Sequence, residues 1–413
     1  MKKSLFALAA TTAFAGAAQA QSSVTVYGLL DIGYVGYNTR VAEGSAGSKA
    51  VNKQTGNAVS SSGESTSRLG FKGTEDLGGG TSAFFTLELG VTPNSQQSVN
   101  TAGTQNRQAF VGLKKNGVGQ FALGTQYTIV HNAVAATDPG QANNISGNVV
   151  YPASTEGSGS VENSTGAAYT VRTNNQLSVN SATFAGFTGN AMLVMNNKNQ
   201  NQTLTGTTTA VTTGGLNNQN GWGLGLNYTW NKLYATANYQ ALTSKQSAQT
   251  TVGGVVQAGT GFPTTGYAGG SSLAGTNVQD NQWYLAATYD FGILKAYAQY
   301  INRKVSAQQN TSYYLSRSAE QIGVRSYITP TIEAWASGGL GRYTGYGSNS
   351  ANLTAWQIGS NYWLSKRTNL YAIYGQAGTS NTTVPTTISG STAIVNPVSA
   401  NISNYAVGVR HTF

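Results

Sequence analysis

The feature that most limits the possible folds is a repeated two-residue alternation of bulky apolar side chains with small or polar ones. Sixteen short segments after residue 20 show this alternation, which is the period of a β-strand with two different faces. They cover 24–34, 68–74, 82–90, 108–114, 120–127, 176–183, 187–195, 222–229, 233–241, 282–289, 293–302, 318–327, 331–340, 355–362, 369–375 and 404–413. The sequence therefore predicts an all-β protein.

The connections between these segments alternate strictly between short and long. Seven tight turns, such as 75–80 and 329–330, alternate with eight long connections rich in Gly, Ser, Thr, Asn and Gln, such as 128–175. A soluble sandwich has no reason to collect its long loops at one end, whereas a membrane barrel has this arrangement. Because hydrocarbon offers no partner to an unpaired strand edge, the sheet must close on itself. We therefore predict a transmembrane 16-stranded antiparallel β-barrel.

The composition excludes other common classes. Only 9% of the residues are charged, against about 25% in a typical soluble domain. Mean hydropathy is nevertheless negative, and no apolar run of about 18 residues follows the N-terminal segment, so a helical membrane protein is excluded. The chain has no cysteine, which rules out disulfides, thiolate metal sites and cysteine catalysis.

The N-terminal segment has the pattern of a secretory signal peptide. Met1 and two lysines precede a short apolar stretch, 5–18, which ends in Ala-Gln-Ala at 18–20. A transmembrane anchor is the alternative, but the stretch is too short and the cleavage motif too clear. We expect a signal peptide at 1–20 and a barrel at 21–413.

Several motifs resemble those of the trimeric general porins of β-proteobacteria, an outer-membrane family of Gram-negative bacteria. They are SVTVYGLLD at 23–31, SRLGFKGTEDLGGG at 67–80, RQAFVGLK at 107–114, FALG at 121–124 and VGVRHTF at 407–413. The resemblance implies passive diffusion of small hydrophilic solutes and ions through a water-filled pore in each subunit of a homotrimer. It also implies lipid and lipopolysaccharide around the barrel, with no cofactor and no nucleic acid.

The resemblance further implies an inward-folded third loop, about 128–167, and a pore constriction. On the basic side the expected residues are Arg68, Arg107, Arg172 and Lys72, and on the acidic side the loop residues Asp138, Glu156 and Glu162. By alternation, Asp31, Glu88, Arg325, Glu333 and Arg410 also face inward. Arginine stays charged at any usable pH, and a narrow lumen focuses its field, so a modest anion preference is expected.

Two observations limit this expectation. Each arginine could instead form an ion pair with a neighbouring acid. Relatives also often have an arginine after the Leu-Gly of the fifth strand, where this chain has Thr125, so the basic cluster could be weaker here.

The last strand has a bulky face that nothing later in the chain covers. We expect Tyr405, Val407, Val409 and Phe413 to face lipid. The resemblance implies that these side chains are also read as an assembly signal by the barrel-assembly machinery.

Three other functions are less consistent with the sequence. An enzyme would need a base near a nucleophile, but His131 has no Gly-x-Ser-x-Gly motif nearby and His411 alternates toward lipid. Nucleic-acid binding is disfavoured because the basic residues do not form runs, despite a pI near 9.5.

The remaining alternative is a substrate-specific channel, or an adhesin using the long loops. A specific channel would have aromatic residues along the lumen, and the candidates are Tyr27, Tyr284, Tyr297 and Tyr327. We favour a position in the aromatic girdles for these tyrosines.

Overall fold

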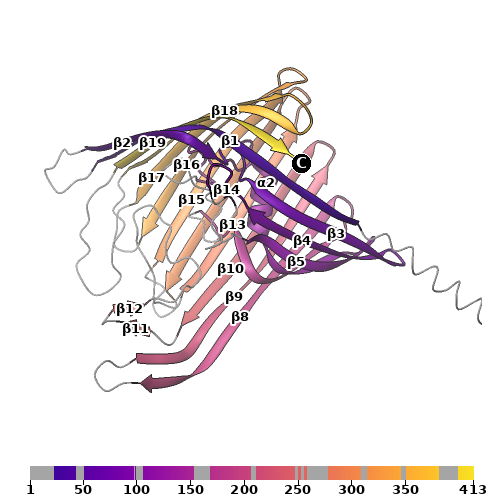
Figure 1. Ribbon diagram of the computed structural model, residues 1–413, viewed down its shortest axis with the longest axis vertical. Coiled ribbons are helices and arrows are strands. Elements are labelled where there is room, and N and C mark those ends of the chain that lie inside the picture. Colours follow the sequence, from indigo (N-terminus) through magenta and orange to yellow (C-terminus); the bar gives the residue numbers. More distant parts are fainter. Residues whose placement is uncertain are drawn as a thin grey trace, which may run out of the picture.

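The structure is a computed structural model, and it describes most of the chain (Figure 1). The described residues are 23–42, 51–96, 98, 106–152, 168–205, 211–246, 250–252, 255–257, 278–307, 314–345, 350–380 and 399–413. The expected signal peptide at 1–20 and the expected loop acids Glu156 and Glu162 lie outside these residues.

The described residues form one large antiparallel sheet, a separate two-stranded ribbon and one α-helix. The sheet contains β1 (Ser23–Ala42), β2 (Val51–Ser61), β3 (Arg68–Gly78), β4 (Thr81–Gly90), β5 (Asn106–Lys115), β6 (Gly119–Tyr127), β7 (Arg172–Ser181), β8 (Phe187–Thr205), β9 (Val211–Trp230), β10 (Leu233–Gln246), β13 (Val278–Asp290), β14 (Lys295–Ala307), β15 (Tyr314–Tyr327), β16 (Ile332–Gly345), β17 (Ala351–Trp363), β18 (Thr368–Ser380) and β19 (Ser399–Thr412). The ribbon is β11 (Thr250–Val252) with β12 (Val255–Gln257), and the helix is α2 (Ile129–Thr137).

The sheet closes because β1 pairs with the last strand, β19, from Leu29 opposite Thr412 to Ala42 opposite Ser399. On its other side, β1 pairs first with β3 and then with β2. The 17 strands of the sheet therefore occupy sixteen positions, because β2 and β3 share one. This confirms the predicted 16-stranded antiparallel barrel.

The shared position shows where the sequence-based prediction was wrong. Residues 35–67 were expected to form a long loop, yet β1 continues to Ala42 and 51–61 form β2. Residues 62–67 then leave the wall before β3 begins. Strand segments that extend beyond the membrane have water on both faces, so they lack the apolar alternation on which the prediction depended. We call residues 62–67 the strand break.

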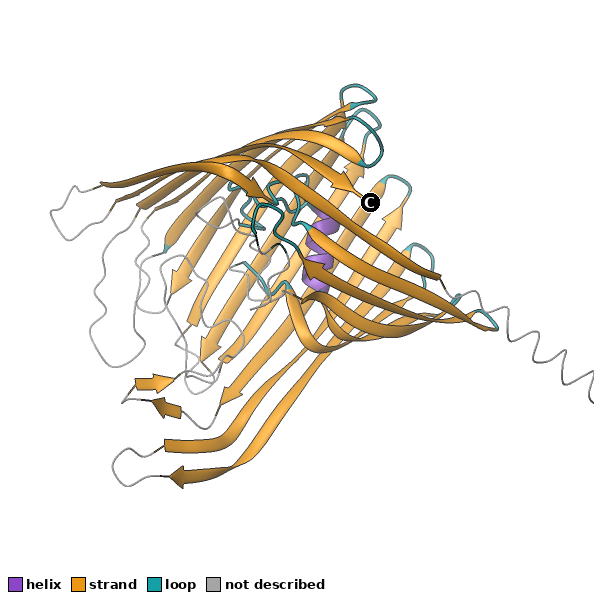
Figure 2. Cartoon of the chain, viewed as in Figure 1, coloured by secondary structure: helices purple, strands orange, loops and turns teal. Residues whose placement is uncertain are grey.

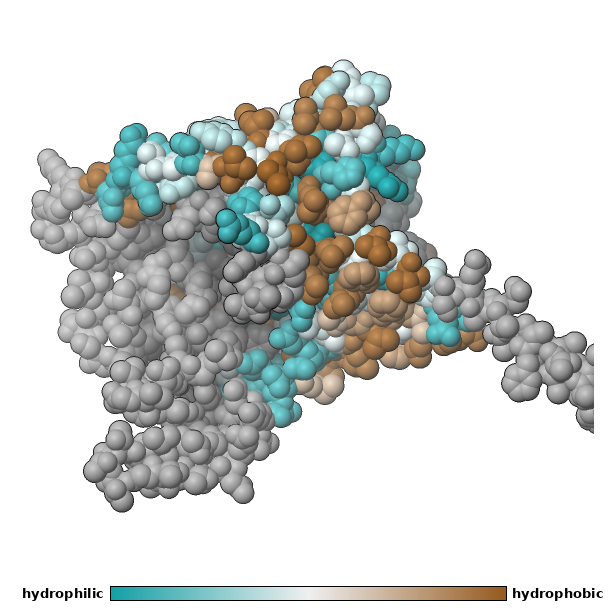
Figure 3. Space-filling view, viewed as in Figure 1, coloured by the Kyte–Doolittle hydropathy of each residue, from teal (hydrophilic) through white to brown (hydrophobic). Residues whose placement is uncertain are grey.

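The two faces of the barrel differ as lipid and water require. Val24 and Val26 on the outer face are 66% and 54% exposed, whereas Asp31 on the inward face is fully buried. Figure 3 shows apolar side chains gathered on the outer surface of the barrel over β1, β3 and β4. An apolar exterior around a polar interior is the inverse of a soluble globule and is typical of a transmembrane barrel.

The helix α2 lies inside the ring of strands (Figure 2). It packs against β8, β9, β10, β13 and β14, and its N-cap Thr128 accepts a hydrogen bond from the His131 backbone N–H. Ile129, Val130 and Val134 are buried in this contact. Among the described residues, no helix has the length and apolar character needed to cross a membrane.

Candidate functional site

Residues 128–152, here called the crossing segment, run along the inward face of the wall after β6. Near its start, Thr137 Oγ1 is hydrogen-bonded to Tyr284 OH (2.5 Å) on β13. Further on, Asn143 Nδ2 donates to Gln357 Oε1 (3.0 Å) on β17. Beyond its middle, Asn144 Nδ2 donates to the carbonyl oxygen of Ser62 (2.7 Å). The crossing segment thus reaches from β6 to the strand break, beside β1, and then returns along the wall to β15, where the Val149 N–H bonds to Gln321.

The wall has glycines where the crossing segment passes closest. A Cβ added to Gly375 on β18 would meet the backbone oxygen of Ser146, and one added to Gly339 on β16 would meet the side chain of Val149. Gly147 itself has φ +110°, a conformation that L side chains rarely adopt. The backbone of the crossing segment can therefore approach the strands directly.

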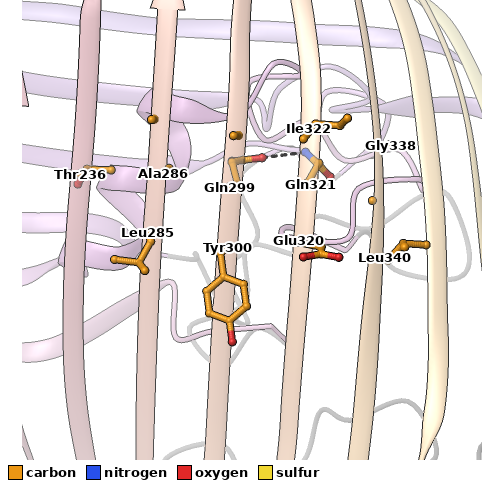
Figure 4. Close-up of a pocket in the computed structure, with 13 residues that line it drawn as sticks. Thr236, Leu285, Ala286, Gln299, Tyr300, Glu320, Gln321, Ile322, Gly338 and Leu340 are labelled. Carbon is orange, nitrogen blue, oxygen red and sulfur yellow. Dashed lines mark hydrogen bonds between the residues drawn. The ribbon is translucent and has the colours of Figure 1, made fainter.

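Buried glutamines form a row along the inward face, and two of them, Gln321 and Gln357, hold the crossing segment to the wall. The row consists of Gln240 on β10, Gln282 on β13, Gln299 on β14, Gln321 on β15 and Gln357 on β17. Gln321 Nε2 donates to Gln299 Oε1 (2.9 Å), as Figure 4 shows, while Gln321 Oε1 accepts from the backbone N–H of Val149 (3.1 Å). An amide both donates and accepts, so it can satisfy a neighbouring strand and a loop backbone together.

Asp138, an expected acid of the constriction, lies at the C-terminal end of α2 and is only 2% exposed. Its carboxylate accepts from the Ala142 N–H (2.7 Å), from Asn148 Nδ2 (2.8 Å) and from Gln321 Nε2 (2.9 Å). Burial raises the pKa of this carboxyl, although these donors oppose the shift. Asp138 thus orders the turn after α2 and ties it to β15.

The structure brings together three of the expected basic residues. Arg107 is fully buried, and its Nε donates to Glu88 Oε1 (2.8 Å), which also lies 3.8 Å from Arg68 Nη1. Arg107 Nη2 donates to Tyr127 OH (2.5 Å), and the Arg172 guanidinium lies 5.1 Å from the centre of the Tyr127 ring. Arg68, Arg107 and Arg172 therefore form one cluster around Glu88 and Tyr127.

Lys72 is placed differently from these arginines. It lies two inward positions along β3 from Arg68, toward the tight turns, and it is exposed. Its Nζ lies 5.2 Å from the centre of the Tyr27 ring, and the Tyr27 hydroxyl donates to Glu88 (3.1 Å). Among the described residues, Lys72 is thus connected to the arginine cluster through Tyr27.

Three other inward arginines of the wall have acidic partners, whereas buried Arg317 on β15 donates to Tyr343 OH and to the carbonyl oxygen of Val149. Arg303 Nη2 lies 2.7 Å from Asp280, Arg325 Nη2 lies 2.6 Å from Glu333, and Arg410 Nε lies 3.4 Å from Glu64. The inward placement predicted for Arg325, Glu333 and Arg410 is confirmed. Continuing the two-residue alternation beyond the predicted ends of the strands, toward the long loops, would have placed Asp280 and Arg303 on the inward face.

Glu64 and Asp31 hold the strand break inside the barrel. Asp31 Oδ2 accepts from the backbone N–H groups of Glu64 (2.8 Å) and Ser65 (2.6 Å), and its Oδ1 accepts from Tyr371 OH (2.6 Å). Sequence reasoning predicted Asp31 as an inward acid but missed Glu64, because the break that turns it inward leaves no periodic pattern.

The four candidate tyrosines all lie on the inward face. Tyr284 and Tyr297 are buried there, Tyr27 also points inward, and Tyr327 is exposed at the tight-turn end of β15, opposite Glu333. The girdle position that the sequence favoured is therefore wrong for these tyrosines. Tyr284 is covered by the crossing segment, so these rings do not form an open aromatic track.

His131 is buried within the crossing segment. Its Nδ1 is hydrogen-bonded to Tyr169 OH (3.1 Å), and its ring lies 4.4 Å from that of Tyr127. Burial, with Arg172, Arg107 and Arg68 nearby, lowers the pKa of His131 well below its ordinary value. Within the described part of the chain, no group of three or more His, Cys, Asp or Glu side chains is positioned to hold a metal ion.

Comparison with known proteins identifies the family. Residues 7–382 match the family model described as Gram-negative porin. The chain belongs to the Gram-negative porin family. This confirms the resemblance found in the sequence motifs. Family membership and the closed barrel place this porin in the outer membrane of a Gram-negative bacterium, in a family of channels rather than enzymes.

Individual relatives match the porin over part of its length. An outer membrane porin protein of Bordetella pertussis is 37% identical over 153 residues, which are 35% of this chain and 39% of the relative. Outer membrane porin protein 32 of Delftia acidovorans is 35% identical over 188 residues, 45% of this chain and 48% of the relative. The matched regions thus span less than half the length of these relatives.

Solved structures share the fold of the porin over almost its whole length. The anion-selective porin from Comamonas acidovorans aligns with a TM-score of 0.65 and 21% identity, covering 95% of this chain and 100% of that one. The trimer form of OmpT from Vibrio cholerae aligns with a TM-score of 0.59 and 15% identity, covering 95% and 99%. At these identities the likeness shows the fold alone.

The outer face of the porin carries the expected C-terminal residues. Tyr405, Val407, Val409 and Phe413 are all exposed there, on and just after β19. Their lipid-facing position agrees with the alternation, and their reading by the assembly machinery stays a prediction.

The same outer face has a hollow of about 710 Å³ over β13–β16, shown in Figure 4. Leu285, Tyr300, Glu320 and Leu340 lie in a row across these strands. Leu285, Tyr300 and Leu340 are exposed outward, on the side opposite to Gln299 and the crossing segment. This hollow is therefore separate from the pore.

Proposed function

We propose that the protein is an outer-membrane porin for the passive diffusion of small hydrophilic solutes and ions, with a modest anion preference. The observation that supports this most strongly is the crossing segment, which occupies the inward face of β8–β18 and leaves the arginine cluster on β3–β7 as the opposite wall. Solutes that pass between them meet a polar wall in which Arg68 is partly exposed and Arg107 and Arg172 are buried.

The preference for anions should be modest because of the ion pairs. Arg107, Arg303, Arg325 and Arg410 each lie beside a carboxylate, so their fields are largely compensated. Arg68 lies 3.8 Å from Glu88, which Arg107 engages at 2.8 Å, so the charge of Arg68 is compensated only in part. Its remaining positive field favours anions without binding them tightly, as conduction requires.

The finer parts of the proposal rest on the sequence and the family. We propose a cleaved signal peptide at 1–20, a homotrimer surrounded by lipid and lipopolysaccharide, and insertion by the barrel-assembly machinery through the C-terminal strand. OmpT of Vibrio cholerae, which shares the fold, has a trimer form, and this supports the proposed homotrimer. Glu156 and Glu162 would supply the acidic side of the constriction, whereas the third expected acid, Asp138, is buried in the turn after α2.

Planar-bilayer recording of the purified protein tests the proposal. The wild type should give stepwise conductance with closures in threes, and a reversal potential in a KCl gradient displaced toward that of chloride. Replacing Arg68, Arg107 and Arg172 by glutamine should displace the reversal potential toward cations. Arg342→Gln, on the outer end of β16, is the control and should leave it unchanged. An unchanged reversal potential in the triple variant would refute the assignment of the cluster.

A further inference from the structure

We infer that the inner wall carries a second anion site, at the end of the barrel with the tight turns and apart from the arginine cluster. A hollow of about 430 Å³ lies on the wall over β1 and β3–β6. Among the side chains that line it are Thr25, Lys72, Ser82, Thr86, Lys114 and Gln120. The inference rests on the proposed function, because the anion must enter the lumen to reach this hollow.

The strand register places polar donors on both sides of each lysine. Lys72 on β3 lies between Thr25 on β1 and Thr86 on β4. Lys114 on β5 lies between Ser82 on β4 and Gln120 on β6. Directly opposed residues of neighbouring strands share a face and come within contact distance, so each ammonium group has hydrogen-bond donors beside it.

Neither lysine is neutralised within the described part of the chain. Lys72 and Lys114 are both exposed, and no carboxylate there forms an ion pair with either of them. Of the neighbouring inward acids, Glu88 is engaged by Arg107, and Asp76 is separated from Lys114 by Ser82 of β4 and accepts from the backbone N–H of Gly78 (2.9 Å). The positive charge in this hollow is therefore available to a solute.

The chemistry of the lining suits a tetrahedral oxyanion. Ammonium groups make charge-assisted hydrogen bonds to phosphate oxygens, and lysine binds phosphate as a mobile point charge. The threonine and serine hydroxyls can donate to the remaining oxygens. We therefore assign the hollow to phosphate or its monoesters. In a porin the tight turns lie on the periplasmic side, so this site would be reached first from the periplasm.

The test is inhibition of chloride current by inorganic phosphate added to one side of a bilayer with oriented channels. In the wild type, phosphate should reduce the current more strongly from the tight-turn side than from the loop side. The double variant Lys72→Gln and Lys114→Gln should need about tenfold more phosphate for the same reduction, the loss expected for two exposed charge pairs. Lys72→Arg with Lys114→Arg keeps the charge and should retain most of the inhibition.

Lys304→Gln is the matched control, because Lys304 is an exposed lysine on the outer face of β14. It should be inhibited like the wild type. Equal inhibition of the wild type and the double glutamine variant, or equal inhibition from both sides, would overturn the inference. Chloride conductance in the same recordings shows that each variant is folded. A channel that conducts chloride but is not inhibited by phosphate refutes this site alone, whereas the absence of any chloride conductance refutes the porin function.

Discussion

Gly375 on β18 offers a sharp test of the position of the crossing segment. Its Cα faces inward, where Ser146 passes, and a Cβ added there would overlap the backbone oxygen of Ser146 and lie 2.8 Å from Gln357 Cγ. A backbone oxygen cannot rotate away as a side chain can. Gly375→Ala should therefore displace the crossing segment from the wall.

The magnitude follows from the contacts. Overfilling a packed site costs about 1–3 kcal/mol. Displacement also weakens the bond that Gln357 Nε2 donates to the Ser146 oxygen (2.8 Å), which is worth about 1 kcal/mol. A total of about 3 kcal/mol would shift the equilibrium between the packed and displaced positions about 100-fold.

Single-channel recording and thermal unfolding in detergent measure this effect. Gly375→Ala should show an altered open conductance, greater open-channel noise and a lower unfolding midpoint. Gly378→Ala on the same strand is the control, because the nearest atom that its Cβ would meet is 3.5 Å away. A Gly375→Ala channel that matches the wild type in conductance, noise and midpoint would show that the crossing segment does not lie against β18.

Two further variants test the charges of the site. Glu88→Gln should lower the free energy of unfolding by about 3 kcal/mol, because buried Arg107 loses its carboxylate partner. The midpoint of thermal unfolding measures this loss. Glu320→Gln, on the outer face, is the control and should leave the midpoint unchanged. Burial lowers the pKa of His131, so the folded protein resists its protonation. Above the ordinary pKa of histidine, His131 does not affect the pH dependence of the free energy of unfolding. Below that pKa the free energy of unfolding falls as the pH drops, by at most about 1.4 kcal/mol per pH unit. The thermal midpoint should therefore fall less between pH 7 and 5 in His131→Gln than in the wild type, and parallel curves would contradict this.

The fold could be predicted wherever lipid constrains the sequence. Each strand that crosses hydrocarbon must be apolar on one face, so segments such as 24–34 carried a clear two-residue period. Beyond the membrane this constraint ends. The sequence of β2, VNKQTGNAVSS, has no apolar face and gave no indication that 51–61 is a strand.

The candidate site could be predicted only in part. Alternation predicted that Arg68 and Lys72 share a face, but it could not show that Lys72 lies apart from the cluster. Arg107 reaches Glu88 beside a register shift between β4 and β5, which the sequence did not reveal. Nor could it show that Asp138 is buried, because its partner Gln321 is 183 residues away.

The pairing of β1 with β19 has a consequence for biosynthesis. Asp31 on β1 lies opposite Arg410 on β19, so β1 acquires this partner only after the other strands of the sheet have been synthesised. Until then its backbone groups have no partner on that side, and such an edge is prone to pair with other chains. Closure of the barrel is therefore a late step in folding, because the local hairpin of β1 with β2 leaves this edge of β1 open.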